Sequence, residues 1–338
     1  MLAVVAADLR APALVVFLLS AFSIVLLAQW MGIATEVLSS AWGPGLGALI
    51  GVTFGNSVEL IIAIIALRDG LYTVVKASII GSILANLLLT LGVCMTIGGV
   101  RSHVQQFSRQ RAGVNSVMLF LAVSGLTITS VAAFLHQGGA SARTESLSVG
   151  VAVVFLVVYV AGFVFSLVTH RSFLGGWEGG DGTERQALST PVAVSVLIVT
   201  TGLVALISDR LVATVTPLGS SFGLSEQFIG LILIPLIGIA PEFLTAVMLA
   251  RRDQLNGSIE IAVGSSLQIA LFVAPLLVVI GLFLSHTLTL VFPPVEVAVL
   301  FLATILVSLV SLDGETNWYE GVMVTATYVI FALLFYFE

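Results

Sequence analysis

The stretch GNSVEL, residues 55–60, places a carboxylate, Glu59, in one of the most apolar parts of the chain. It lies between the apolar runs GALIGVTF and IIAIIAL. A carboxylate at bilayer depth costs at least about 2.5 kcal/mol on insertion scales, so it is normally kept only where it faces a cavity or a partner. The rest of the sequence therefore has to supply something for Glu59 to face.

The composition is that of a membrane protein. Of 338 residues, 59% are apolar and 9% charged, and the mean hydropathy is +1.17, whereas soluble domains carry about 25% charged residues. Apolar runs of roughly 18–25 residues recur along the chain, each long enough to cross about 30 Å of hydrocarbon as a helix. The alternating pattern of barrel strands is absent. We expect an all-α, multi-pass membrane protein with ten spans, near residues 11–31, 44–67, 72–97, 113–135, 147–169, 190–213, 227–250, 258–284, 288–311 and 318–337.

Charge and cysteine content exclude several classes of function. The net charge of −6 is small and spread along the loops, which argues against nucleic-acid binding. The single cysteine, Cys94, lies inside the third predicted span and is expected to pack as an apolar side chain. No redox chemistry is implied.

An internal repeat supplies a partner for Glu59. Sliding the chain along itself until Gly55 meets Gly238 aligns GNSVEL with GIAPEF, residues 238–243, without a gap, and Glu59 then falls on Glu242. Chance alignment of apolar composition would give Leu and Ile matches but not repeated glycine and serine ones. Further identities at the same offset are Ala63 with Ala246, Arg68 with Arg251, Gly81 with Gly264, Ser82 with Ser265, Leu84 with Leu267, Leu88 with Leu271, Ile97 with Ile280 and Gly98 with Gly281.

The repeat divides the chain into two halves. Residues 1–169 form a first five-helix repeat with its motif at 51–98, and residues 190–338 form a second with its motif at 234–281. Because five spans separate the two copies, they are expected to cross the membrane in opposite senses, which is a transporter architecture with its site near the midplane. The polar segment 170–189 reads as a linker. A small excess of Lys and Arg on its side of the membrane places it in the cytoplasm, and the short loops favour a prokaryotic plasma membrane.

Oxygen-bearing side chains accompany both glutamates. Glycine or proline precedes each one, so the helices are expected to break there and release backbone carbonyl groups. In the first motif Asn56 precedes Glu59, and Ser82 and Asn86 share one face of the following helix. The second motif offers Ser265 and Gln268 in the matching segment. Carboxylates, hydroxyls and amides form an all-oxygen set suited to calcium or another hard cation.

Other polar residues have simpler interpretations. Ser78, Ser266 and Gly264 are small residues at a spacing common in helix packing. Glu296 and Asp313 lie near the ends of predicted spans, so we expect both at the membrane interface.

At these residues the sequence resembles the calcium/cation antiporter superfamily, and most closely its cation/proton exchanger branch. The segments GNSVEL to KASIIGSILANLLL and GIAPEF to IAVGSSLQIALFVAPLLVVIG resemble the two alpha-repeat motifs of that superfamily. The resemblance implies the ten-helix fold of the sodium/calcium exchangers. It also implies that Glu59 and Glu242 bind the transported ion, with Asn56, Ser82, Asn86, Ser265 and Gln268 around them.

The chain departs from the family pattern at three places. Ile239 and Phe243 stand where proton exchangers usually have asparagine and histidine, and Pro241 is more like the sodium/calcium exchangers. Sodium/calcium exchangers usually carry an acidic residue where this chain has Gln268 and Ile269, which favours protons as the counter-ion.

The expected function is therefore secondary antiport of calcium, or a similar divalent cation, against protons. Calcium is cargo here, and no cofactor is expected. The alternative is a sodium/calcium exchanger of the same fold. A passive cation channel and an intramembrane hydrolase are more remote, because no HExxH motif or nucleophile with a base is visible and the four histidines, His103, His136, His170 and His286, lie in loops or at span ends.

Overall fold

The computed structural model describes residues 7, 11–102, 104–135, 142–165, 188–284 and 287–338. Most of the predicted linker and all four histidines lie outside these residues. The described part is helical apart from two short strands. Its elements are α2 (Ala13–Ala41), α3 (Gly43–Gly55), α4 (Ser57–Arg68), α5 (Tyr72–Leu84), η1 (Ala85–Thr90), α6 (Leu91–Arg101), β1 (Gln105–Gln106), α7 (Arg109–Leu135), α8 (Ala142–Val164), α9 (Thr190–Ala213), α10 (Val215–Phe222), α11 (Glu226–Phe228), η4 (Ile229–Leu233), α12 (Ile234–Gly238), α13 (Ala240–Arg251), α14 (Leu255–Gln268), η5 (Ile269–Val273), α15 (Ala274–Gly281), α16 (Pro294–Val310), β2 (Glu315–Thr316) and α17 (Trp318–Phe337).

The helices confirm a multi-pass membrane protein. Within the described residues, seven helical rods are individually long and apolar enough to cross a bilayer, and an eighth is a bent pair, 226–251. Each predicted span overlaps at least one helix. Helix α2 is longer than the first predicted span, 11–31, because it continues through Glu36 to Ala41 before the chain turns at Trp42.

The helices break where the glutamate motifs predicted. Helix α3 ends at Gly55 and α4 begins at Ser57, while α12 ends at Gly238 and α13 begins at Ala240. The repeat alignment pairs Gly55 with Gly238 and Ser57 with Ala240. The helix boundaries therefore lie at aligned residues in the two halves. The second break bends the chain by 56°. The expectation of interrupted helices is confirmed at both places.

Three π-helical segments lie within the long helices near these breaks. Segment η1 joins α5 to α6, η4 joins α11 to α12, and η5 joins α14 to α15. Segment η1 contains Asn86, η5 begins directly after Gln268, and η4 precedes α12. The first and the last along the chain lie at corresponding places in the two halves. A π-helical turn places one extra residue in the rod and re-aims the side chains around it, and such turns are frequent at functional sites.

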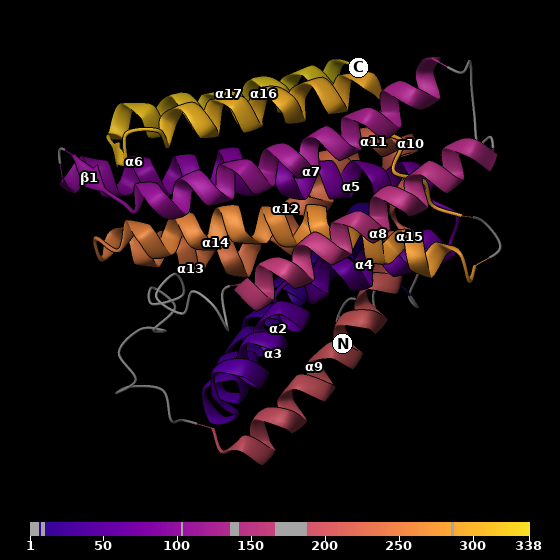
Figure 1. Ribbon diagram of the computed structural model, residues 1–338. Helices are drawn as coiled ribbons and strands as arrows, with labels where there is room; N and C mark the ends of the chain where they lie inside the picture. The colour runs from indigo at the N-terminus through magenta and orange to yellow at the C-terminus, as the bar shows by residue number, and fades with distance from the viewer. Residues whose placement is uncertain (1–6, 8–10, 103, 136–141, 166–187, 285–286) are drawn as a thin grey trace.

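The rods form one stack with a tilted group beside it (Figure 1). Helices α6, α14 and α17 run roughly alongside one another, whereas α2, α3 and α9 run together at a steep angle to them. Helices α6 and α17 cross at two glycines. A Cβ on Gly92 would lie 2.5 Å from the Thr325 hydroxyl oxygen and 2.7 Å from its amide nitrogen, and a Cβ on Gly321 would meet the backbone of Thr96. The crossing therefore depends on the absence of side chains at both positions.

The two broken helices are packed differently. Segments η4 and α12 lie against α5, where a Cβ on Gly81 would overlap the carbonyl oxygen of Leu231 and lie 2.7 Å from Pro235 Cγ. The counterpart segment α3 instead packs along α2. Gly264, which aligns with Gly81, has no described atom within 4 Å of where its Cβ would lie. The repeat is thus matched in sequence and in helix boundaries but not in packing.

A pair of short strands joins loops from the two halves. Strands β1 and β2 pair antiparallel, with Gln105 opposite Thr316 and Gln106 opposite Glu315. The Phe107 amide also donates to the Gly314 carbonyl oxygen over 2.9 Å. The connection after α6 is thereby tied to the connection between α16 and α17.

The two carboxylates expected at span ends differ in burial. Asp313 is exposed, but Glu296 has only 1% of its surface exposed, in the first turn of α16. Glu296 is buried because of a tertiary contact: its carboxyl group accepts a hydrogen bond from Gln227 Nε2 over 2.9 Å. Cys94 is a buried free thiol, as its apolar surroundings in the sequence predicted.

The unequal packing of the aligned glycines, Gly81 and Gly264, predicts unequal effects of the same substitution. Gly81→Ala places a methyl group against backbone, so we expect a loss of about 1–3 kcal/mol of stability, seen as a lower thermal unfolding midpoint. Gly264→Ala, at the aligned position, has room for the same methyl group and should leave the midpoint nearly unchanged. Equal losses in the two variants would contradict the asymmetric packing.

Candidate metal centre

The two glutamates occupy equivalent places at the starts of helices. Glu59 lies in the first turn of α4 and Glu242 in the first turn of α13, each three residues after the break. The amide groups of a helix N-terminus favour a nearby negative charge. The breaks therefore place both carboxylates where the backbone partly offsets the cost of removing them from water.

The breaks also bring the two carboxylates together. A Cβ on Gly238, the last residue of α12, would lie 2.9 Å from Glu59 Cγ and 3.0 Å from its Oε1, so the side chain crosses from one half to the break in the other. The Glu242 carboxyl group lies close enough to Glu59 for their charges to interact directly. Glu59 Oε1 and Glu242 Oε2 are both buried and have no hydrogen-bond partner among the described residues. Each glutamate thus keeps an unused acceptor in the interior.

Neutral oxygen and amide groups surround the pair. Asn56 Nδ2 donates to Gln268 Oε1 over 2.5 Å, which joins the first break to the end of α14. Asn56 Oδ1 is buried without a partner among the described residues. The side chains of Asn86 and Ser265 lie within polar interaction range of the Glu242 carboxyl group. Six of the seven predicted site residues therefore each contact, or interact electrostatically with, at least one other.

The seventh residue, Ser82, lines a small cavity beside Glu59. The cavity measures about 10 Å³, enough for about one water-sized sphere. Its polar lining consists of Glu59, Ser78 and Ser82, and Gly238 forms part of its wall. Ser78 was interpreted from the sequence as a packing residue, but the cavity shows it facing the same space as Ser82, four residues further along α5.

A second residue that sequence reasoning missed is Thr90. Its hydroxyl group donates to Asn86 Oδ1 over 3.5 Å, within the buried segment η1. The spacing of four residues after Asn86 was the available signal. The Asn86 Nδ2 lies near Glu242 and has no geometric hydrogen-bond partner among the described residues.

The chemistry of this set is compatible with a hard cation. Within the described residues no three His, Cys, Asp or Glu side chains gather into a cluster. The site consists instead of two carboxylates completed by hydroxyl and amide oxygens, which suits a divalent cation that prefers oxygen ligands. These oxygen atoms come from both repeat motifs, so a bound ion would contact both halves of the chain.

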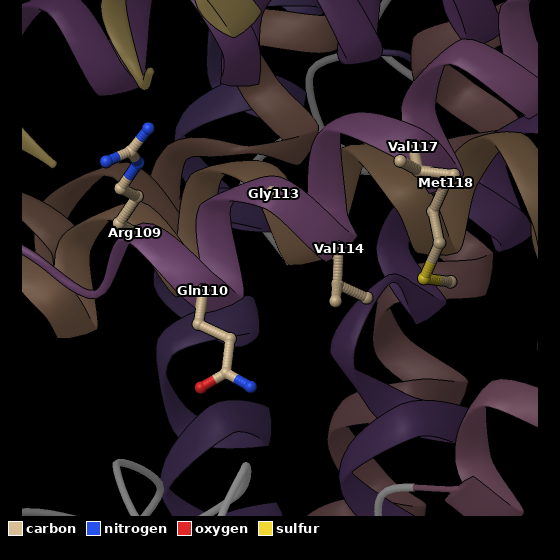
Figure 2. A pocket seen from close by; sticks show the side chains of 6 residues that line it. All are labelled: Arg109, Gln110, Gly113, Val114, Val117 and Met118. Carbon is tan, nitrogen blue, oxygen red and sulfur yellow. The ribbon is translucent and has the colours of Figure 1, made fainter. Parts of the chain in front are cut away.

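A larger groove lies elsewhere and lacks these features. It has a volume of about 710 Å³ and runs along α7 beside Arg109, Gln110, Gly113, Val114, Val117 and Met118. Figure 2 shows these side chains spread along one stretch of that helix, with the charged and amide groups only at its start. The groove has no carboxylate in its lining and none of the predicted site residues, so it does not compete with the glutamate pair as a cation site.

One known protein family matches both halves of the chain. Residues 12–168 and 192–337 match the family described as sodium/calcium exchanger protein. The chain belongs to this family. The match omits a segment around the predicted linker and includes all seven predicted site residues of the exchanger motifs.

Individual relatives of this exchanger are similar along almost its whole length. It is 38% identical to the Ca(2+)/H(+) antiporter ChaA of Bacillus subtilis (strain 168), covering 99% of this chain and 95% of that one. It is also 38% identical to the vacuolar calcium ion transporter of Schizosaccharomyces pombe, covering 95% and 79%. Among solved structures, native YfkE is 36% identical with a TM-score of 0.87, covering 100% of this exchanger and 97% of that chain. The H+/Ca2+ exchanger CAX, at 15% identity and a TM-score of 0.74 over 98% and 84%, supports the fold alone.

The close approach of the two carboxylates predicts their effect on stability. In a chelator at alkaline pH both are ionised and repel each other, so Glu59→Gln or Glu242→Gln should raise the thermal unfolding midpoint. The gain should shrink as the pH falls and the parent carboxylates take up protons. Glu36→Gln, on an exposed residue of α2, serves as the control and should leave the midpoint unchanged. Lower midpoints in both site variants at alkaline pH would show that the carboxylates are not opposed.

Proposed function

We propose that the chain is a secondary active antiporter that exchanges calcium, or a similar divalent cation, for protons by alternating access. The observation that carries the proposal is the meeting of Glu59 and Glu242 at two helix breaks, each with a buried oxygen left without a partner among the described residues. The names of the similar proteins, Ca(2+)/H(+) antiporters among them, support calcium and protons as the exchanged ions.

The coupling follows from competition at one site. A divalent cation binds strongly only when both carboxylates are ionised, and protons neutralise the same groups. Glu59 and Glu242 would therefore carry either calcium or protons, with Asn56, Ser82, Asn86, Ser265 and Gln268 completing the oxygen set. No bond in a substrate is made or broken, so we infer a transporter rather than an enzyme, with calcium as cargo and no cofactor.

We further infer that ten helices cross the membrane as two inverted five-helix repeats, 1–169 and 190–338. The equal offset of both helix breaks, of α4 and α13, and of the ends of η1 and η5 supports this division. The segment 170–189 would then be the linker between the halves, in the cytoplasm. The near full-length similarity to bacterial relatives supports a plasma membrane location.

The main rival is a sodium/calcium exchanger on the same fold. Gln268 is neutral in this chain and adds no negative charge to the proposed site. A site with only two carboxylates offers less negative charge for binding several sodium ions in place of calcium. This observation favours protons as the counter-ion.

A transport assay in proteoliposomes tests the proposal. A pH gradient should drive calcium uptake against its concentration gradient, whereas a sodium gradient at equal pH on both sides should not. Glu59→Gln and Glu242→Gln should each abolish this uptake, and the exposed control Glu36→Gln should retain it. Uptake that persists in both site variants would refute the site, uptake driven by sodium would favour the rival exchanger, and downhill flux alone would indicate a channel.

The asymmetry between the two motifs gives a separate prediction. Asn56→Leu removes both the hydrogen bond to Gln268 and a buried oxygen, so the apparent calcium affinity should fall by about tenfold. The residue aligned with Asn56 is the buried Ile239, which has no polar atom in its side chain. Ile239→Leu should therefore leave the affinity within about twofold. Calcium titrations of uptake rates compare the two, and equal effects would contradict an unequal role for the half-sites.

A further inference from the structure

A second group of buried polar side chains lies outside the candidate metal centre. Glu296, in the first turn of α16, is 1% exposed; its Oε1 accepts a hydrogen bond from Gln227 Nε2, and its Oε2 has no partner among the described residues. Lys76 of α5 interacts electrostatically with Glu296 and donates to Thr289 Oγ1 over 3.1 Å. Glu338, at the end of the chain, is the other charged group that acts on Glu296.

The position of Gln227 connects this group to the metal centre. Gln227 belongs to α11, the start of a continuous helical rod, residues 226–238, that runs through η4 and α12. The rod ends at Gly238, which lies against Glu59. A hydrogen bond that fixes the start of the rod therefore also fixes the wall of the site at its other end.

Between these two ends the rod packs tightly on α5. A Cβ on Gly230 would lie 2.9 Å from Ala77 Cβ and 3.0 Å from Val74 Cα, and Gly81 makes the reciprocal approach to Leu231. Lys76 projects from the same helix. The polar group thus joins the rod, α5 and α16 at one end of the seam between the rod and α5.

The repeat-related positions lack this group. The repeat alignment that pairs Glu59 with Glu242 places Pro44 at the position of Gln227, Gly113 at that of Glu296 and Ile259 at that of Lys76. The corresponding segment α3 packs along α2, and Gly264 on α14 faces open space among the described residues. The broken helix that carries Gln227 is therefore the one that packs against α5.

We propose that Gln227, Glu296 and Lys76 are positioning residues that hold the rod 226–238 on α5 and thereby keep Gly238 against Glu59. The Gln227 amide supplies a hydrogen-bond donor to the buried Glu296 carboxyl group, which would otherwise lose that partner in the interior, and Lys76 is the positive charge that acts on the same group. This polar anchor acts on only one of the two broken helices. It rests on the proposed function only in that movement of this rod would form part of the transport cycle.

Thiol labelling along the seam tests the anchor. In a Cys94→Ala background, Val74→Cys places a smaller side chain at a position 1% exposed beside Gly230, and Ala262→Cys places a reference thiol on α14 at a position 0% exposed. A charged, water-soluble reagent reacts with residue 74 only when the rod leaves α5. Gln227→Leu should raise that rate about tenfold, since a buried hydrogen bond is lost and the Glu296 carboxyl group keeps no donor in its place, and Glu296→Gln should raise it about threefold. The rate at residue 262 should stay within about twofold.

Controls keep the outcomes distinct. Gly113→Ala, at the position aligned with Glu296, has open space for its methyl group and should change neither rate. Equal increases at residues 74 and 262 would mean general loosening and would overturn the proposal, as would an unchanged rate at residue 74 in a folded Gln227→Leu protein. If Gln227→Leu does not fold, Glu296→Gln decides. The labelling requires no transported ion, so its result is independent of which cation and counter-ion the protein exchanges.

Discussion

The main constraint on the structure is the repulsion between two carboxylates held in an apolar interior. Glu59 and Glu242 lie close enough to interact, and each retains a buried oxygen without a partner among the described residues. A positive charge that reaches the pair, whether a proton or a metal cation, lowers the free-energy cost of that arrangement. The helix breaks, the glycines and the surrounding amides are explained by this constraint, because together they bring the carboxylates to one place and line it with oxygen atoms.

Glycine has opposite uses at aligned positions. Gly81 allows α5 to touch the backbone at Leu231, whereas Gly264 leaves space open beside α14. Glycine therefore permits a close helix contact at residue 81, whereas at residue 264 no neighbouring atom lies within 4 Å of the position of a Cβ. If the two halves exchange arrangements during transport, both positions must be glycine even though only one is crowded in this conformation.

The two helix breaks beside the glutamates could be predicted from sequence because their determinants are local and repeated. A single gapless offset pairs Glu59 with Glu242, and the neighbouring Gly55, Gly238 and Pro241 mark the breaks. The unequal packing could not be predicted in this way, because both halves carry glycine at the aligned positions and only tertiary contacts distinguish them. The burial of Glu296 was missed for a similar reason, since its partner Gln227 is 69 residues away and a carboxylate after two prolines is typical of a helix start near the interface. The π-helical segments leave no clear signal in apolar runs such as residues 87–89.

The short strands β1 and β2 have a mechanical consequence. They join the loop after α6 to the loop before α17, and the two helices are also interlocked at Gly92 and Gly321. Contacts at both a loop and a helix crossing tie α6 and α17 to each other. The tilted group of α2, α3 and α9 takes part in neither contact (Figure 1). The bracing therefore links a helix of the first sequence repeat to a helix of the second, rather than two helices of one repeat.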